Sequence, residues 1–293
     1  MKAIYYFIIS LIIIGLGLGL GLGLGLKNNS NNSMKEKNYE DKIVVCFYGV
    51  VSRSIKYTHK RVKKTIIDCL KTQYDVDVYV FNNNVENNYI DGIKQNNNDV
   101  KLLKSDFFEE IKQSEIDKDI KSKNIDMSFF RSDYGMDART NAIRHMYIEE
   151  QVGKFLEKNI KKYSRAIVCC ADFWLINNIN LQEIKNCINN TSSVYIPPNS
   201  ENYPGRGYVD SFYFGSLLPV IKILKRYSII DEIIENDDDF EYMLKKTFDK
   251  YNIRKLNSEI TFLKIRSDKR IWTPYDIEDD TIQSIRNEIN NIT

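Results

Sequence analysis

The stretch Lys42–Val51 reads KIVVCFYGVV, an apolar run that turns at a glycine and continues into Ser52-Arg53-Ser54. A run without alternating polar residues predicts a strand that is buried on both faces. Further apolar strands are expected at Val76–Phe81, Val100–Leu103 and Ala166–Cys170. Such strands, separated by amphipathic helices, predict an α/β fold with a mostly parallel sheet and helices on both faces.

The remaining elements are predicted from the spacing of apolar residues. Helices are expected at Tyr57–Tyr74, Asn141–Tyr163, Leu181–Asn189, Leu217–Leu224 and Phe240–Tyr251. Strands are expected at Ser193–Ile196 and Ile260–Ile265, and the charged segment Asp106–Asp126 is expected to hold a helix and a loop.

The beginning of the chain predicts a membrane anchor. Ala3–Leu26 contains no charged residue, and at ~1.5 Å per residue a helix of this length spans a bilayer core of ~30 Å. We expect an uncleaved signal-anchor transmembrane helix at 1–26, a polar stalk at 27–41, one domain at 42–275 and a C-terminal tail at 276–293; a cleaved signal peptide is the alternative. Flanking lysines favour a cytosolic domain and Asn-x-Ser/Thr sequons a lumenal one, so the orientation of this single-pass protein stays open.

Composition excludes several classes of protein. Lys+Arg is 42 and Asp+Glu is 40, a balance that does not indicate a nucleic-acid partner. The five cysteines and two histidines lack zinc-ligand spacing, which argues against a metalloenzyme with His or Cys ligands. No G-x-G-x-x-G or P-loop motif follows a strand. We interpret His145 and Cys169-Cys170 as structural residues.

Polar residues follow two of the expected strands, where ligands of parallel sheets bind. Gly49, Ser52 and Arg53 follow the first strand, and a glycine with a fixed cation suits a nucleotide phosphate. Asp172 follows Ala166–Cys170 and could bind a divalent ion or a sugar hydroxyl. The alternatives are a solvated turn and an Asp turn, respectively.

Three further groups of residues are candidates for a role in binding or catalysis. The literal D-x-D spelling at Asp75-Val76-Asp77 enters a strand, so we interpret it as structural. The loop Tyr203–Asp210 combines aromatic residues, glycines, a cation and a carboxylate, a composition that suits sugar binding or a surface turn. Glu241 and the acidic run Asp237–Asp239 begin a helix, where acidic residues usually complement the helix dipole.

Four segments, in this order, resemble a group of GT-A-like glycosyltransferases found in bacteria, algae and large DNA viruses. They are Ile43–Asp68 (IVVCFYGVVSRS…YTHKRVKKTIID), Ala166–Leu175 (AIVCCADFWL), Val194–Ser216 (VYIPPNSENYPGRGYVDSFYFGS) and Glu241–Arg266 (EYMLKKTFDKYNIRKLNSEITFLKIR). The resemblance implies a GT-A-like, Rossmann-type fold and transfer of a sugar from a nucleotide-sugar donor to a glycan, protein or lipid acceptor.

The resemblance also implies roles for single residues. Arg53 would contact the nucleotide, Asp172 would lie near the donor sugar or its metal, and Asp210 and Glu241 would lie around the acceptor side. Together with the composition of the loops, this predicts donor binding by Gly49, Ser52, Arg53 and Asp172, catalysis by Asp172, Asp210 and Glu241, and an acceptor loop with Tyr203, Arg206 and Asp210. Asp172 would hold a Mn²⁺ or Mg²⁺ cofactor.

One departure from the group bears on the metal. Cys170 stands where the group has an arginine, or where a D-x-D would have its first aspartate, and a single carboxylate binds these ions poorly. A metal-independent enzyme, a metal held mostly by the diphosphate, and a non-catalytic membrane-anchored protein that retains the fold all stay open. Another nucleotide-dependent transferase, such as a sulfotransferase, is the third choice.

Overall fold

The computed structural model describes residues 42–87, 89–130, 135–198, 207–235 and 239–292. The expected transmembrane helix and stalk, residues 1–41, lie outside the described residues. Among the helices that are described, none combines the length and the apolar character needed to cross a bilayer.

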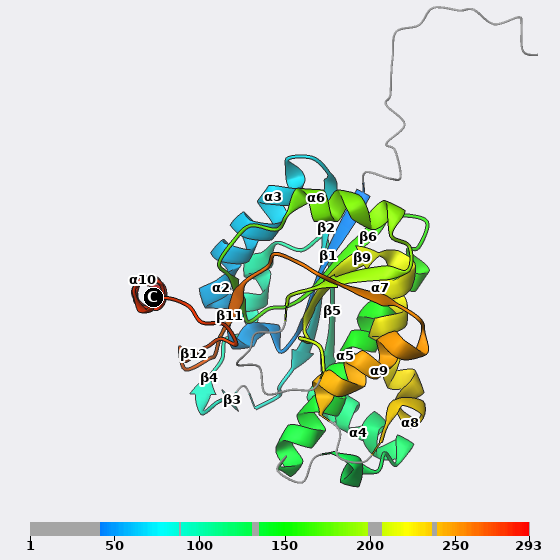
Figure 1. Cartoon of the computed structure of the whole chain (residues 1–293). Helices are drawn as coiled ribbons and strands as arrows, with labels where there is room; N and C mark the ends of the chain where they lie inside the picture. Colours follow the sequence, from blue (N-terminus) through cyan, green and yellow to red (C-terminus); the bar gives the residue numbers. More distant parts are fainter. Residues whose placement is uncertain (1–41, 88, 131–134, 199–206, 236–238, 293) are drawn as a thin grey trace, which may run out of the picture. The chain divides into compact units, whose positions relative to one another are not determined.

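The core of the fold is a seven-stranded sheet with the order β10-β8-β9-β6-β1-β2-β5 (Figure 1). Its strands are β1 (Lys42–Gly49), β2 (Asp75–Asn84), β5 (Phe107–Lys112), β6 (Arg165–Cys170), β8 (Ser193–Ile196), β9 (Phe212–Ser216) and β10 (Arg254–Asn257). All neighbouring strands are parallel except at β9, which runs antiparallel to both β6 and β8. The predicted mostly parallel sheet is therefore confirmed, with one reversed strand.

The stretch KIVVCFYGVV forms the central strand β1. Ile43–Tyr48 is buried throughout, and Cys46 lies beside Tyr79 of β2 and Val168 of β6. Both neighbours run parallel to β1, and both faces of the sheet are covered, so the side chains of Ile43–Tyr48 are shielded from water. This explains why its sequence is apolar without alternation.

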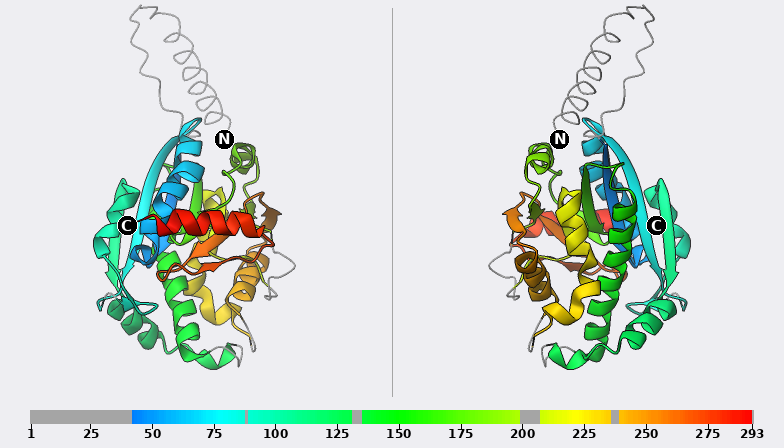
Figure 2. Two further views of the ribbon diagram at one scale, coloured as in Figure 1. Left: turned by 90° about the vertical axis from the view of Figure 1, so that its left-hand side faces the viewer. Right: turned by 90° about the vertical axis from the view of Figure 1, so that its right-hand side faces the viewer.

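Helices cover the two faces of the sheet. On one side the chain runs continuously through α2 (Ile55–Val62), a π-helical turn (Lys63–Asp68) and α3 (Cys69–Lys71), close to the predicted single helix. On the other side α5 (Met136–Lys158) packs on β1 and β2, and α7 (Leu217–Leu224) packs on β9 (Figures 1 and 2). The other helices are α4 (Gln113–Lys123), α6 (Leu181–Asn186), α8 (Ile230–Ile233) and α9 (Phe240–Lys250), with 3-10 turns at Val51–Arg53, Asn97–Leu103, Met127–Phe129, Cys187–Asn189 and Lys225–Ile229.

A smaller sheet joins the last segment of the chain to the domain. Its strands, in the order β12-β11-β7, are β12 (Ile271–Trp272), β11 (Phe262–Ile265) and β7 (Phe173–Leu175), and both pairings are antiparallel. Residues 276–293, expected as a tail, contain helix α10 (Asp279–Asn290), which crosses this sheet in Figure 2. Its Ile285 and Ile289 are buried in a separate apolar cluster with Trp174 and Leu263, which ties the end of the chain to the domain.

One strand prediction is wrong. Val100–Leu103 belongs to a 3-10 helix, and the third parallel strand is instead β5, within the charged segment expected as helix and loop. β5 is an edge strand whose side chains are mostly exposed, so it carries charges where a central strand would be apolar. A short hairpin of β3 (Tyr89–Ile90) and β4 (Ile93–Lys94) precedes it.

Candidate functional site

A pocket of about 570 Å³ opens where β1, β2 and β6 end. Tyr48 and Gly49 line it from β1, Asn83 from β2, and Cys170 from the last position of β6. This is the edge at which parallel sheets bind ligands. Most of its remaining lining comes from the loops after these strands, the β3–β4 hairpin, the first half of α5, Asp210 and Ser211, and the segment at the end of β11. Gln113 at the start of α4 and Phe240 at the start of α9 complete it.

The exit from β1 positions the first cation of the pocket. Gly49 has φ +103°, in the left-handed region where residues with a Cβ are strained, so the turn needs glycine. Asn82 Oδ1 accepts a hydrogen bond from the Val51 N–H at 3.0 Å and holds the short helix that follows. Arg53 lines the pocket from this helix, whereas Ser52 is buried and does not line it.

Arg53 is fixed by a carboxylate from the β3–β4 turn. Its Nε and Nη2 donate to the two carboxylate oxygens of Asp91 at 3.0 and 2.8 Å. The Ser267 hydroxyl also donates to Asp91, at 2.6 Å. Burial alone would raise the pKa of Asp91, but these hydrogen bonds lower it to about 2. Asp91 therefore stays ionised and orients the guanidinium in the pocket wall.

Asp172 lies beyond β6, as predicted, and meets a second arginine. Arg266 Nη1 donates to Asp172 Oδ2 at 2.9 Å, and the Ile265 N–H donates to the Asp172 carbonyl at 2.9 Å. The other carboxylate oxygen, Oδ1, is buried and has no hydrogen-bond partner among the described residues. A buried acceptor without a partner costs free energy, so Oδ1 is available for a ligand.

Asp210 lines the pocket from a position just before the reversed strand β9. Its Oδ2 accepts from the Ser211 hydroxyl at 2.8 Å, and Lys264 Nζ lies 3.8 Å from Oδ1. Burial alone would raise the pKa of Asp210, but the charge of Lys264, with a smaller contribution from His145, lowers it. Burial would lower the pKa of Lys264, and the charges of Asp210 and Asp172 raise it. Both groups therefore remain charged in the pocket wall.

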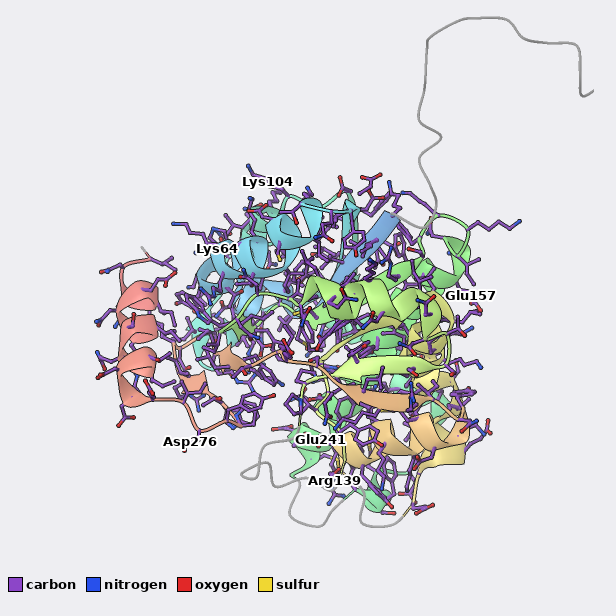
Figure 3. All side chains as sticks on the ribbon, turned by 45° about the horizontal axis from the view of Figure 1, so that its top comes forward. Lys64, Lys104, Arg139, Glu157, Glu241 and Asp276 are labelled. Atoms are coloured by element: carbon purple, nitrogen blue, oxygen red, sulfur yellow. The ribbon has the colours of Figure 1, made fainter. Side chains whose placement is uncertain are left out.

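Glu241 is not brought into the pocket lining. Its backbone carbonyl accepts from the Tyr208 N–H at 3.0 Å, and a Cβ on Gly207 would lie 1.9 Å from the Glu241 carbonyl carbon. Gly207 thus permits a close approach that holds the segment leading to Asp210 on the start of α9. Figure 3 shows Glu241 and Arg139 near the same edge of the molecule. At the start of α9 it is Phe240, the residue before Glu241, that lines the pocket.

Below the pocket lies a buried charged network. Glu149 of α5 is fully buried and pairs with Arg226 Nη2 at 2.6 Å. The hydroxyls of Tyr48 and Tyr213 both donate to Glu149 Oε1 at 2.9 Å. Tyr48 also bonds His145 Nε2 at 2.8 Å, and His145 lines the pocket. His145 therefore lies between this network and the pocket.

The described side chains do not fit a divalent ion held by the protein. Among the described residues no three His, Cys, Asp or Glu side chains come together as ligands. Asp172 offers a single free oxygen, because Arg266 occupies the other, and Asp210 is occupied by Ser211 and Lys264. Mn²⁺ and Mg²⁺ need several oxygen ligands, which one carboxylate oxygen does not supply.

The literal D-x-D lies at the opposite end of the sheet, as predicted. Asp77 pairs with Lys42 at 3.0 Å and Lys162 at 2.8 Å, and accepts from the Tyr163 hydroxyl at 2.7 Å. Asp75 lies 3.4 Å from Lys42. These bonds join the starts of β1 and β2 to the loop before β6, which is a structural role.

The pocket brings together four predicted residues: Gly49, Arg53, Asp172 and Asp210. Tyr203 and Arg206, predicted for the acceptor loop, lie outside the described residues. Sequence reasoning missed Tyr48, Asp91, His145, Lys264 and Arg266. A signal existed for Lys264 and Arg266, which end an apolar strand, whereas Asp91 lies in an Asn-rich stretch without a pattern and His145 in a helix whose faces could not be told apart.

A comparison of the sequence with protein-family models and with curated proteins finds no match.

Proposed function

We propose that this protein is a glycosyltransferase that moves a sugar from a nucleotide-sugar donor to a glycan, protein or lipid acceptor, anchored in a membrane through residues 3–26. The observation that carries the proposal is the charge pattern of the pocket. Four cations, Arg53, Arg144, Lys264 and Arg266, line it beside three carboxylates, Asp91, Asp172 and Asp210. A diphosphate needs fixed cations, and a sugar needs hydrogen-bond acceptors.

The strand order supports a GT-A-like fold. Read from β5, the order is β5-β2-β1-β6-β9-β8-β10 with β9 reversed, and the resemblance implies a mostly parallel sheet of this kind with helices on both faces. The pocket volume of about 570 Å³ lies within the ~300–1,000 Å³ of small-molecule sites. A nucleotide-sugar therefore finds enough room at the edge where ligands of such sheets bind.

Each charged group has a role in this proposal. Arg53 from the loop after β1 and Arg266 from the end of β11 bind the diphosphate, while Asp172 Oδ1 accepts a hydrogen bond from a hydroxyl of the donor sugar. Lys264 stabilises the negative charge of the departing nucleoside diphosphate. Because the described residues do not form a metal site, we propose that donor binding needs no divalent ion held by the protein.

A non-catalytic membrane-anchored protein of the same fold remains the second candidate, supported by the pairing of every pocket cation with a carboxylate. The two functions are separated by a panel of UDP-, GDP- and CMP-sugars tested on the full chain in detergent, with EDTA or with Mn²⁺. We expect one donor to raise the melting temperature and to be hydrolysed slowly, with EDTA making little difference.

Asp172→Asn tests the site itself. Loss of the charge that orients Arg266 should lower turnover about 10²-fold, or about 2.7 kcal/mol of transition-state stabilisation. Asp77→Asn, at the other end of the sheet, is the matched control and should keep its turnover. Absence of a shift with every donor, with and without Mn²⁺, would instead favour the non-catalytic protein.

A further inference from the structure

His145 lies on the face of α5 that borders the pocket. Asn141, Ala142 and Ile148 line the pocket from the same helix at helical spacing, and the His145 side chain is 20% exposed. The ring makes edge contacts with Tyr48 and Phe240, at centroid distances of 5.0 and 4.9 Å. Two aromatic neighbours thus hold the imidazole in one orientation.

The hydrogen bonds of Tyr48 determine which nitrogen of His145 carries a proton. Tyr48 Oη lies 2.9 Å from Glu149 Oε1 and 2.8 Å from His145 Nε2. An ionised carboxylate only accepts, and a phenol has one proton to donate. The Tyr48 proton therefore points to Glu149, and the Tyr48 oxygen accepts from a protonated Nε2.

The surroundings keep both partners in these protonation states. Burial raises the pKa of Tyr48 far above its usual range, so its hydroxyl keeps its proton. Burial would raise the pKa of Glu149, but the charge of Arg226 and then that of His145 lower it, so Glu149 is ionised. In a neutral His145 the proton is thus on Nε2, and Nδ1, which makes no hydrogen bond within the described part of the chain, has a free lone pair.

Other charged groups near His145 come from several elements. Asp210 precedes β9, Lys264 lies in β11, and Arg144 is the neighbouring residue on α5, where it pairs with Asp117 at 2.6 Å. Asp210 and Glu149 both interact electrostatically with His145. Arg226 pairs with Glu149 and Lys264 lies near Asp210, so each cation neutralises part of the charge of one of these carboxylates.

We propose that His145 is the general base of the transfer reaction and that Tyr48 and Glu149 are its positioning residues. This inference rests on the proposed function. The acceptor hydroxyl gives its proton to Nδ1 as its oxygen bonds to the anomeric carbon of the donor sugar. The bond from that carbon to the phosphate oxygen breaks, and the nucleoside diphosphate leaves with the electron pair. A single displacement of this kind inverts the anomeric centre.

The first test measures the tautomer and needs no substrate. The chain has only two histidines, so ¹⁵N-histidine labelling gives two pairs of ring-nitrogen signals, and His59→Gln assigns each pair to its residue. At alkaline pH, where an imidazole is neutral, long-range ¹H–¹⁵N spectra of the full chain in detergent should show His145 protonated at Nε2. Tyr48→Phe should disturb that preference. A proton on Nδ1 in the wild type would overturn the inference.

The second test is kinetic and uses the donor found in the panel, with water as the acceptor. His145→Gln should leave the melting-temperature shift by the donor unchanged and lower kcat by about 10²–10⁴-fold. The loss of rate toward acid pH in the wild type should also disappear. A variant that keeps the wild-type kcat and pH profile excludes His145 as the base.

Two tyrosines provide a matched pair for the positioning role. Tyr48→Phe and Tyr213→Phe each remove one 2.9 Å hydrogen bond to Glu149 Oε1, but only Tyr48 bonds His145. We expect Tyr48→Phe to lower kcat about 10-fold or more, with KM little changed, and Tyr213→Phe to have a much smaller effect. Equal losses would show that both act on stability alone and would overturn the positioning role.

The two inferences fail in distinguishable ways. If no donor binds the wild type, the proposed function fails and the catalytic role falls with it, whatever the tautomer. If the donor binds and turns over but His145→Gln is fully active, the proposed function stands and the base is another group. Release of a sugar with retained anomeric configuration also contradicts a single displacement assisted by His145.

Discussion

Two buried glutamates in this protein meet opposite surroundings. Glu149, under the pocket, is fully buried against Arg226 and two tyrosine hydroxyls, and its pKa is lowered despite its burial. Glu183, in α6, is 8% exposed and accepts a hydrogen bond from the Glu259 N–H, and burial raises its pKa to about 7.

The difference between them shows that burial alone does not decide the charge of a carboxyl group. At Glu149, a cation and two hydroxyl donors stabilise the ionised form more than burial destabilises it. At Glu183, a single backbone N–H is too weak to offset the effect of burial. The compensated charge is the one next to the pocket. This is consistent with a carboxylate that has to stay ionised to orient Tyr48 and His145.

The largest effect is expected when this compensation is broken. Glu149→Gln leaves the Arg226 guanidinium buried without its counter-charge, which should destabilise the protein by about 3–5 kcal/mol in chemical denaturation. Lys225→Met, at the residue before Arg226, is the control. It removes only the exposed ion pair between Lys225 and Glu157, which is worth about 0–1 kcal/mol. Similar losses in both variants would contradict the contrast drawn between the two glutamates.

Glu183→Gln should have the opposite sign. The neutral amide keeps the shape of the side chain and avoids burying a charge, so at pH 8 the variant should be more stable by about 2 kcal/mol. Glu288→Gln on exposed α10 should stay within about 0.5 kcal/mol of the wild type. A destabilised Glu183→Gln protein would show that the charge of Glu183 is compensated after all.

The pH dependence of this gain gives a sharper test. The pKa of Glu183 is raised from 4.5 to about 7 in the folded state. Below pH 4.5 it is protonated in both states, so wild type and Glu183→Gln should be equally stable. Between pH 4.5 and about 7 the wild type loses stability relative to the variant, and above that the difference is constant. Unfolding free energies across this range check the window.

The smallest effect on stability is expected at Asp77, a carboxylate that is paired with cations but lies near solvent. Asp77 has two lysines and a tyrosine hydroxyl, and Asp77→Asn should cost about 1 kcal/mol, against a few tenths for Asp75→Asn. Burial would raise the pKa of Asp77, but Lys162, Tyr163 and Lys42 lower it. Its contribution is therefore present above pH 3.8 and disappears as the pH falls below that value. Loss of turnover in Asp77→Asn would contradict the structural role of this D-x-D.

The sequence by itself determined the central layers of the fold. The apolar runs at Ile43–Tyr48 and Ala166–Cys169 are buried on both faces, and a strand with that environment has no position for a polar residue. Gly49 after β1 and Asp172 after β6 could be assigned to the ligand-binding edge of the sheet, because ligands bind at the carboxyl ends of parallel strands. The same rule separated Asp172 from Asp75 and Asp77, although the latter pair has the D-x-D spelling.

Only the tertiary structure decided the partners of these residues. Asp91, His145 and the pair Lys264 and Arg266 reach the pocket from three separate segments, and no local pattern records which distant side chains will meet. Strand β5 was missed for the same reason. It is exposed because it lies at the edge of the sheet with only one neighbouring strand, and its own residues do not record that position. The local sequence specifies which strands are buried and which of their ends binds ligands. Which charged side chains pair with one another depends on contacts between distant segments of the fold.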